Sequence, residues 1–230
     1  NQDYELISAL RAAVRLEEIE QDTVAGIPTE KIEEVAEVML NSEFGIIFFG
    51  LGVTMTPGKS RNIDAALSLV RDLNFRTKFL IMPMRGHFNV TGANEVTAWQ
   101  TGYPFAVDLS HGYPRYNPGD TTVIDVLARG ECDAALVVSS DPLSHFPASV
   151  SKHLSDIPLI TIDPHVTATT LVSEVAFPSA FVGIESQGTV YRMDGVPLEA
   201  KKIVNPPRGV RSDEEILRAI LPKVKELRRN

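Results

Sequence analysis

Short apolar runs alternate along this chain with segments of helical spacing, and this alternation constrains the fold more than any other feature. The runs occupy residues 45–50, 78–82, 134–139 and 158–162, and residues 175–177 form a candidate fifth. Continuous apolar runs are typical of parallel strands that are covered on both faces. Parallel strands that alternate with helices are joined by right-handed crossovers. We therefore predict an α/β fold with a doubly wound, mainly parallel sheet, or sheets, flanked by helices.

The remaining pattern predicts helices of ordinary length and one irregular stretch. Helical spacing covers the first twenty residues and residues 28–40, 60–73, 121–128, 148–154 and 213–227. Ser212 is the expected N-cap of the last helix, with Glu215 three residues on. Residues 84–118 are rich in Gly and Pro, which predicts mostly a long ordered loop. We expect an N-terminal helical segment and a first α/β lobe in residues 1–85, and a second α/β lobe in residues 86–230. The two lobes could also pack together as one domain.

Composition excludes several classes of protein. A formal net charge of −8 argues against a nucleic-acid binder, because phosphate binding requires basic faces. No apolar run approaches the roughly 20 residues that span a bilayer, so we expect no membrane insertion. The only cysteine, Cys132, cannot form an internal disulfide, so we expect a cytoplasmic location, and Cys132 is interpreted as a structural thiol. Histidine spacing matches no metal motif, so no directly bound metal is expected. The chain begins with Asn1, and we expect a fragment or a processed product.

Two kinds of strand end carry candidate binding residues. The first strand runs into a glycine-rich turn with Gly50, Gly52 and Thr54, where a phosphate could approach the backbone. The spacing is not that of a Walker loop, and a tight turn is the alternative.

The other kind is an Asp-Pro corner, and it occurs twice. Ser140 and Asp141 follow one strand, and Asp163 follows the next. Each corner alone is consistent with a turn. Together, at one edge of a sheet, two carboxylates could bind ribose hydroxyls or guanine N–H groups.

A polar segment also follows the strand at residues 78–82. Arg85, His87 and Asn89 alternate, so in an extended chain they point the same way. One interpretation is a polar network that anchors the following loop. The other is an anion site, with a guanidinium for a carboxylate or phosphate and an imidazole for proton transfer.

Taken together, the motifs resemble those of a known family. They are Phe49-Gly-Leu-Gly-Val-Thr, Met84-Arg-Gly-His-Phe-Asn, Val138-Ser-Ser-Asp-Pro, Ile162-Asp-Pro-His-Val-Thr and Ile184-Glu-Ser-Gln-Gly-Thr. In this order they resemble molybdopterin oxidoreductases of the formate dehydrogenase type. Residues 101–108 and 112–119 are most similar to the B subunit of tungsten- or molybdenum-containing formylmethanofuran dehydrogenases.

This resemblance implies a cofactor and site residues. The cofactor would be bis-molybdopterin guanine dinucleotide with tungsten or molybdenum, and the reaction would be reduction of CO2 to formate for methanofuran formylation, within a complex of several subunits. By similarity, the cofactor-binding residues are Gly50, Gly52, Thr54, Asn89, Ser140, Asp141, Asp163, Thr167, Glu185, Gly188 and Thr189. Arg85 would lie beside the metal and the one-carbon substrate, with His87 next to it.

The departures from the family pattern leave rival functions open. The family's metal-ligating cysteine lies in a segment that this sequence does not contain, and Cys132 is in a different motif. Arg192 stands where formate dehydrogenases tend to have asparagine. We therefore expect the C-terminal portion of a catalytic subunit, inactive alone. The alternatives are a cofactor-free scaffold of a formyltransferase/hydrolase complex and a generic nucleotide-binding domain.

Overall fold

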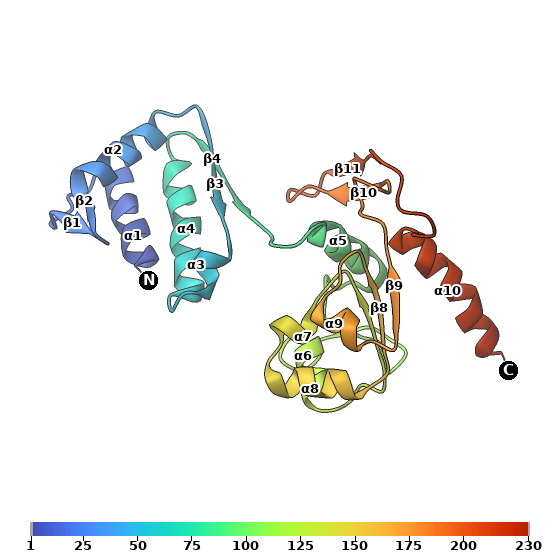
Figure 1. Cartoon of the computed structure of the whole chain (residues 1–230). Helices are drawn as coiled ribbons and strands as arrows, with labels where there is room; N and C mark the ends of the chain where they lie inside the picture. The colour runs from blue at the N-terminus through green and yellow to red at the C-terminus, as the bar shows by residue number, and fades with distance from the viewer. Residues whose placement is uncertain (1, 230) are drawn as a thin grey trace. The chain divides into compact units, whose positions relative to one another are not determined.

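The computed structural model describes residues 2–229, which fold as two compact units, residues 2–90 and residues 91–229 (Figure 1). The elements of the first unit are α1 Asp3–Val14, β1 Thr23–Val24, β2 Ile27–Pro28, α2 Thr29–Leu40, β3 Phe44–Phe49, α3 Leu51–Met55, α4 Lys59–Leu73 and β4 Lys78–Pro83. Strands β3 and β4 pair in parallel, with Phe44 opposite Lys78. The two predicted strands and the crossover helix between them are confirmed.

In the first unit, α1, α2 and α4 lie on one side of the two-stranded sheet (Figure 1). The core between helices and sheet contains buried Ile32, Leu69, Leu73 and Phe79. Gly45 on β3 makes room for the Phe79 ring, since a Cβ at this position would lie 2.1 Å from it.

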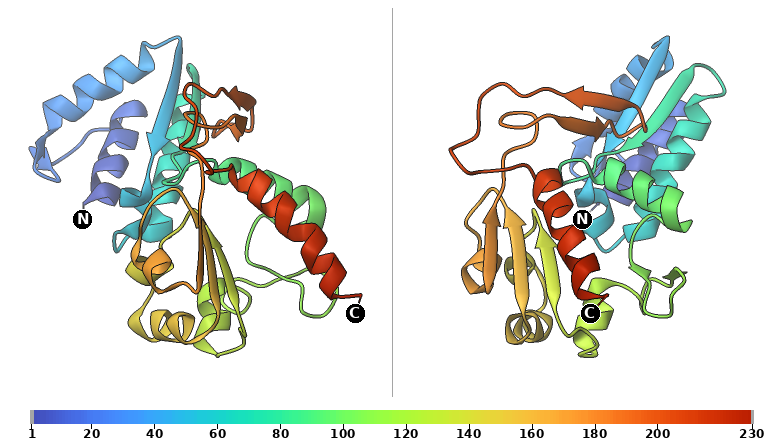
Figure 2. Two further views of the ribbon diagram at one scale, coloured as in Figure 1. Left: turned by 45° about the vertical axis from the view of Figure 1, so that its right-hand side comes forward. Right: turned by 90° about the vertical axis from the view of Figure 1, so that its right-hand side faces the viewer.

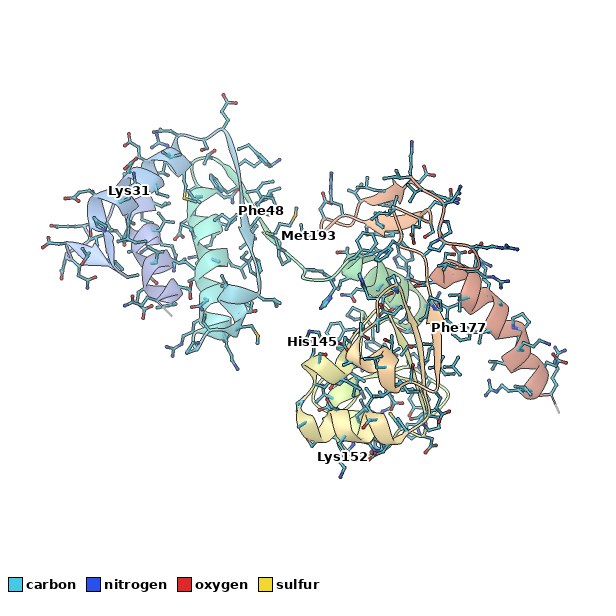
Figure 3. The ribbon with its side chains drawn as sticks, in the orientation of Figure 1. Lys31, Phe48, His145, Lys152, Phe177 and Met193 are labelled. Atoms are coloured by element: carbon cyan, nitrogen blue, oxygen red, sulfur yellow. The ribbon has the colours of Figure 1, made fainter. Side chains whose placement is uncertain are left out.

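The other face of this sheet is apolar and exposed. Phe44, Phe48 and Leu80 are each between 44% and 53% exposed. Phe48, labelled in Figure 3, belongs to this uncovered face. The helices of this unit therefore cover one side of its sheet.

A buried carboxylate ties α4 to α1. The side chain of Asp72 is 5% exposed and accepts a hydrogen bond from Arg11 Nε at 2.8 Å and a longer one from Arg15 Nη1 at 3.4 Å. Burial raises the pKa of this carboxyl, but the hydrogen bond and charge of Arg11, together with Arg15, outweigh that effect and leave the pKa below its usual value.

The second unit holds a three-stranded parallel sheet in the order β7-β8-β9, visible in Figure 2. Its elements are α5 Val90–Thr101, β5 Val107–Asp108, β6 Arg115–Tyr116, α6 Val123–Ala128, β7 Ala135–Val138, α7 Pro142–His145, α8 Ala148–Asp156, β8 Leu159–Asp163, α9 Ala168–Val172, β9 Val175–Pro178, β10 Gly188–Tyr191, β11 Pro197–Ala200 and α10 Asp213–Leu227. Leu127, Val150, Leu154 and Leu159 form its buried apolar cluster. The fold class is confirmed, as small parallel sheets flanked by helices.

The prediction of mostly loop for residues 84–118 missed the helix α5, and β5 and β6 pair within the remainder. The extended chain in which Arg85, His87 and Asn89 would point the same way does not form, because residues 86–89 bend and Asn89 has φ +54°. Helix α5 buries only Thr91 and Gly92, so it carries no apolar stripe from which helical spacing could be read.

The C-terminal helix follows the prediction closely. Ser212 Oγ accepts a hydrogen bond from the backbone N–H of Glu215, and the Glu215 carboxylate accepts one from the backbone N–H of Ser212. This reciprocal pair is the capping box that the sequence indicated. Across residues 2–229, every helix is too short or too polar to cross a membrane.

Candidate functional site

The carboxyl edge of the β7-β8-β9 sheet brings three strand ends together. Val138 of β7 lies opposite Ile162 of β8, and Asp163 at the end of β8 lies opposite Pro178 of β9. The corner at Ser140 and Asp141 and the corner at Asp163 therefore follow neighbouring strands at the same edge. This is the juxtaposition that the sequence predicted, and such edges are where α/β proteins bind ligands.

The carboxylate of Asp141 is held by side chains from two helices. Its Oδ1 accepts from the backbone N–H of Thr169 at 3.0 Å and from Thr169 Oγ1 at 2.6 Å. Its Oδ2 accepts from Ser144 Oγ at 2.5 Å. The hydrogen bonds from Ser144 and Thr169 lower the pKa of Asp141. A carboxylate has about four acceptor positions, so most of those on Asp141 are occupied within the protein.

The second corner is also ordered by hydrogen bonds of its own. Buried Asp163 accepts the backbone N–H of His165 at 2.8 Å, which closes an Asx-turn. Thr167 caps α9, because its hydroxyl accepts the backbone N–H of Thr170 at 3.1 Å. The ring of His165 packs edge-on against Phe181, with 5.0 Å between ring centroids. The turn is thus fixed before any ligand arrives.

The backbone at the first corner is strained. Exposed Ser139, directly after β7, has φ +48°, in the left-handed region that non-glycine residues rarely adopt. A side chain here costs about 1 kcal/mol relative to ordinary backbone angles. This backbone conformation turns the chain from β7 into the Ser140 corner.

The glycine-rich turn of the first unit has a different form from the one expected. Gly50 is the N-cap of the short helix α3, which contains Gly52 and Thr54, and the Thr54 hydroxyl donates to the carbonyl of Leu51 at 3.0 Å. A Cβ at Gly50 or Gly52 would meet nothing within 4 Å. Packing of the described residues therefore requires neither glycine.

Buried Asn62 organises the end of this turn and was missed by sequence reasoning. Its Nδ2 donates to the carbonyl of Val53 at 2.9 Å and to Thr56 Oγ1 at 2.6 Å. Its side chain fills the space beside Gly58, where a Cβ would lie 2.2 Å from Asn62 Oδ1. An asparagine inside a helical stretch gives no signal for such a role.

Arg85 and His87 are exposed, and Asn89 is half-buried, in the segment between β4 and α5. The positive φ of Asn89 turns the chain into α5. The backbone that joins these three residues is not extended, so strand alternation does not align their side chains.

The remaining predicted residues lie around the β10-β11 hairpin. Glu185 Oε2 accepts the backbone N–H of Phe181 at 3.1 Å, while Gly188 and Thr189 begin β10. A Cβ on Gly188 would approach Val182 to 3.1 Å. Arg192 pairs with Asp194 in the hairpin turn at 2.6 Å.

Two serines near this segment have buried hydroxyls without a hydrogen-bond partner among the described residues. They are Ser179, which follows β9 and is 4% exposed, and Ser186. The backbone N–H of Ser179 donates to the carbonyl of Asp163, which ties it to the same carboxyl edge. Buried polar groups normally find a partner, so these hydroxyls mark places where a ligand or water could donate or accept.

Within residues 2–229, no group of three or more His, Cys, Asp or Glu side chains is arranged to hold a metal ion. Cys132 is half-buried, and burial, followed by Glu131 and Asp133, raises the pKa of its thiol. The thiolate that metal binding requires is therefore disfavoured at this residue.

Comparison with known proteins gives a consistent result. The sequence is 54% identical over 227 residues to the B subunit of tungsten-containing formylmethanofuran dehydrogenase 2 of Methanocaldococcus jannaschii, and 50% identical over 228 residues to that of Methanococcus maripaludis. Each alignment covers 99% of this chain and 52% of the relative. The chain thus spans about half the length of these relatives.

A solved structure shares the fold. It is the formyltransferase/hydrolase complex of Methylorubrum extorquens with methylofuran, in which one chain matches with a TM-score of 0.61 at 21% identity, over 87% of this chain and 53% of that one. The sequence profile of the molybdopterin oxidoreductases matches residues 11–223. With nearly its whole length matched by that profile, the chain belongs to the molybdopterin oxidoreductase family.

Proposed function

We propose that this chain is part of the catalytic B subunit of a cytoplasmic tungsten- or molybdenum-dependent formylmethanofuran dehydrogenase, and that it binds bis-molybdopterin guanine dinucleotide. The observation that carries the proposal is the meeting of the Asp141 and Asp163 corners at one carboxyl edge. The high identity to the tungsten-containing relatives supports the same assignment.

The residues at this edge fit the nucleotide end of the cofactor. A guanosine diphosphate group offers N–H and O–H donors together with phosphate oxygens. The exposed hydroxyls of Ser139 and Ser140 and the carboxylate of Asp163 lie at this edge. The hydroxyl of Ser179 is buried beside them and lacks a partner among the described residues. Gly50 and Gly52 leave open space beside the backbone for a second nucleotide. The described residues supply no thiolate cluster for the metal, so its protein ligand would come from elsewhere in the subunit.

When bound, the cofactor supplies electron transfer for reduction of CO2 to formate. The part assigned to this chain is binding and orientation. Arg85 would hold the formate carboxylate through a charge-assisted contact worth about 1.5 to 3 kcal/mol. His87 would move a proton beside it, and Asn89 would bind the cofactor. Methanofuran would be bound by other subunits of the complex, and the isolated chain would be inactive.

The first test is metal and pterin analysis of the complete protein, purified anaerobically with its partner subunits. Tungsten or molybdenum together with pterin guanine dinucleotide supports the proposal. An active complex with neither would exclude it.

The second test concerns Arg85. In the complete complex, Arg85→Lys keeps the charge but loses the planar fork that binds a carboxylate, so turnover should fall strongly. Arg76→Lys, at an exposed position before β4, is the matched control and should leave turnover unchanged. Equal turnover of the two variants would remove Arg85 from the mechanism.

The cofactor-free scaffold remains a second candidate because of one observation. The chain is 27% identical over 115 residues to the B subunit of the formyltransferase/hydrolase complex of Methylorubrum extorquens, whose name describes transfer and hydrolysis rather than redox chemistry. Under this alternative, the complete complex would assemble and act without pterin or metal.

A further inference from the structure

The hydroxyl of Thr169 joins the two corners of the carboxyl edge. It donates to Asp141 Oδ1 at 2.6 Å and accepts the backbone N–H of Leu143 at 3.1 Å. Thr169 is fully buried, with 0% exposure, in α9. One side chain thus holds the start of α7, after the first corner, and anchors it on the helix that follows the second corner.

Both carboxylate oxygens of Asp141 accept hydrogen bonds at this contact between the two corners. The backbone N–H of Thr169 also donates to Asp141 Oδ1, at 3.0 Å, so one carboxylate oxygen receives two donors from a single residue. The other oxygen accepts Ser144 Oγ at 2.5 Å. Because the carboxylate stays ionised at neutral pH, these are charge-assisted bonds, which are shorter and stronger than neutral ones.

The join lies at the carboxyl end of the sheet, beside the apolar core. Leu143, whose backbone N–H donates to Thr169 Oγ1, packs against the cluster of Leu127, Val150, Leu154 and Leu159. The strand ends are held by sheet pairing, which continues one bond past β7, from the backbone N–H of Ser139 to the carbonyl of Ile162 at 2.8 Å. Farther along the first corner, Thr169 contacts Asp141 and the backbone N–H of Leu143. A ligand that touches both corners requires their separation to be set beforehand.

We propose that Thr169 is a positioning residue that acts through Asp141 to preset the spacing of the two corners for the guanine nucleotide end of the cofactor. This inference rests on the proposed function. It assigns to Asp141 a largely internal role, with direct nucleotide contact left to Ser139, Ser140 and the Asp163 turn.

The test is the affinity of the chain for GDP, used as a probe of the nucleotide end, in three variants. Thr169→Val removes the hydroxyl at nearly constant shape, and Thr169→Ser retains it. Thr161→Val is the matched control, because Thr161, in β8, is also a buried threonine, 1% exposed, with its hydroxyl 3.1 Å from Ser173 Oγ.

We expect Thr169→Val to weaken GDP binding at least tenfold, and Thr169→Ser to restore it to within about threefold of the wild type. The control should lose thermal stability without a comparable loss of affinity. If Thr169→Val binds GDP as the wild type does, the positioning role is wrong while the proposed site survives. If the wild type binds no GDP, the nucleotide site of the proposed function fails, and this role fails with it.

If Thr169→Val does not fold, hydrogen exchange of the wild type with and without GDP tests the same coupling between the two corners. In the wild type, GDP should slow exchange in residues 139–145 and 163–171 together, including the amides of Leu143 and Thr169 that the join protects. Slower exchange in only one of these two segments would overturn the coupling.

Discussion

Asp72 offers the sharpest test of what stabilises the first unit. Its carboxylate is 5% exposed and receives the Arg11 guanidinium at 2.8 Å. A hydrogen bond between charged groups of this kind is worth about 1.5 to 3 kcal/mol. Arg15 is 39% exposed, so its longer contact adds little. Asparagine keeps the shape and one acceptor, and Asp72→Asn should therefore reduce the local stability of α4 by about 2 kcal/mol at pH 7.

The effect should depend on pH in a defined direction. The pKa of Asp72 is lowered in the folded state, so its contribution is fully present above the unfolded pKa of about 3.9 and is lost as the pH falls through the folded pKa. The difference between wild type and variant should be constant near neutral pH and should shrink below about pH 4.

Hydrogen exchange of the α4 amides measures this opening free energy without assuming that both units unfold together. The control is Glu34→Gln, since Glu34 and its partner Lys31 are each 60% exposed, and no measurable change is expected there. Equal effects of the two variants, or a difference that persists undiminished in acid, would refute the reasoning.

Three further predictions concern other parts of the chain. Gly45→Ala should lower the melting temperature of the first unit, because its Cβ would lie 2.1 Å from the Phe79 ring, whereas Gly52→Ala, with nothing within 4 Å, should not. Ser212→Ala should cost α10 about 1 kcal/mol of local stability, seen as faster exchange of its first-turn amides only. Cys132 should react with iodoacetamide more slowly in the folded chain than after denaturation at pH 8, because burial raises its pKa; equal rates would contradict this.

The parallel strands and long helices were predictable because each has a local signature. The run at residues 45–50 is apolar throughout, and α10 has an amphipathic face and a capping box. Helix α5 was missed because it buries a threonine and a glycine in place of an apolar stripe. The turn at Asn89 was missed because asparagine can adopt either a positive or a negative φ, and tertiary contacts decide between them.

Part of the candidate site was predictable from the sequence and part was not. The adjacency of Asp141 and Asp163 follows from strand order, since both residues come at the ends of successive strands in a parallel sheet. The bond between Asp141 and Thr169 spans 28 positions and depends on how α7 and α9 meet, which no local pattern specifies. Roles in cofactor binding remain predictions for every one of the site residues.

The pairing of β3 with β4 has a consequence for how the chain is made. Both strands and the helix between them lie within residues 44–83, and the core residues described for this unit all precede residue 83. At a translation rate of about 5 to 20 residues per second, synthesis of residues 91–230 takes on the order of ten seconds. Small domains with such short-range pairing fold in milliseconds to seconds. The first unit can therefore fold on the ribosome before the second has been translated, and the carboxyl edge of the β7-β8-β9 sheet forms after it.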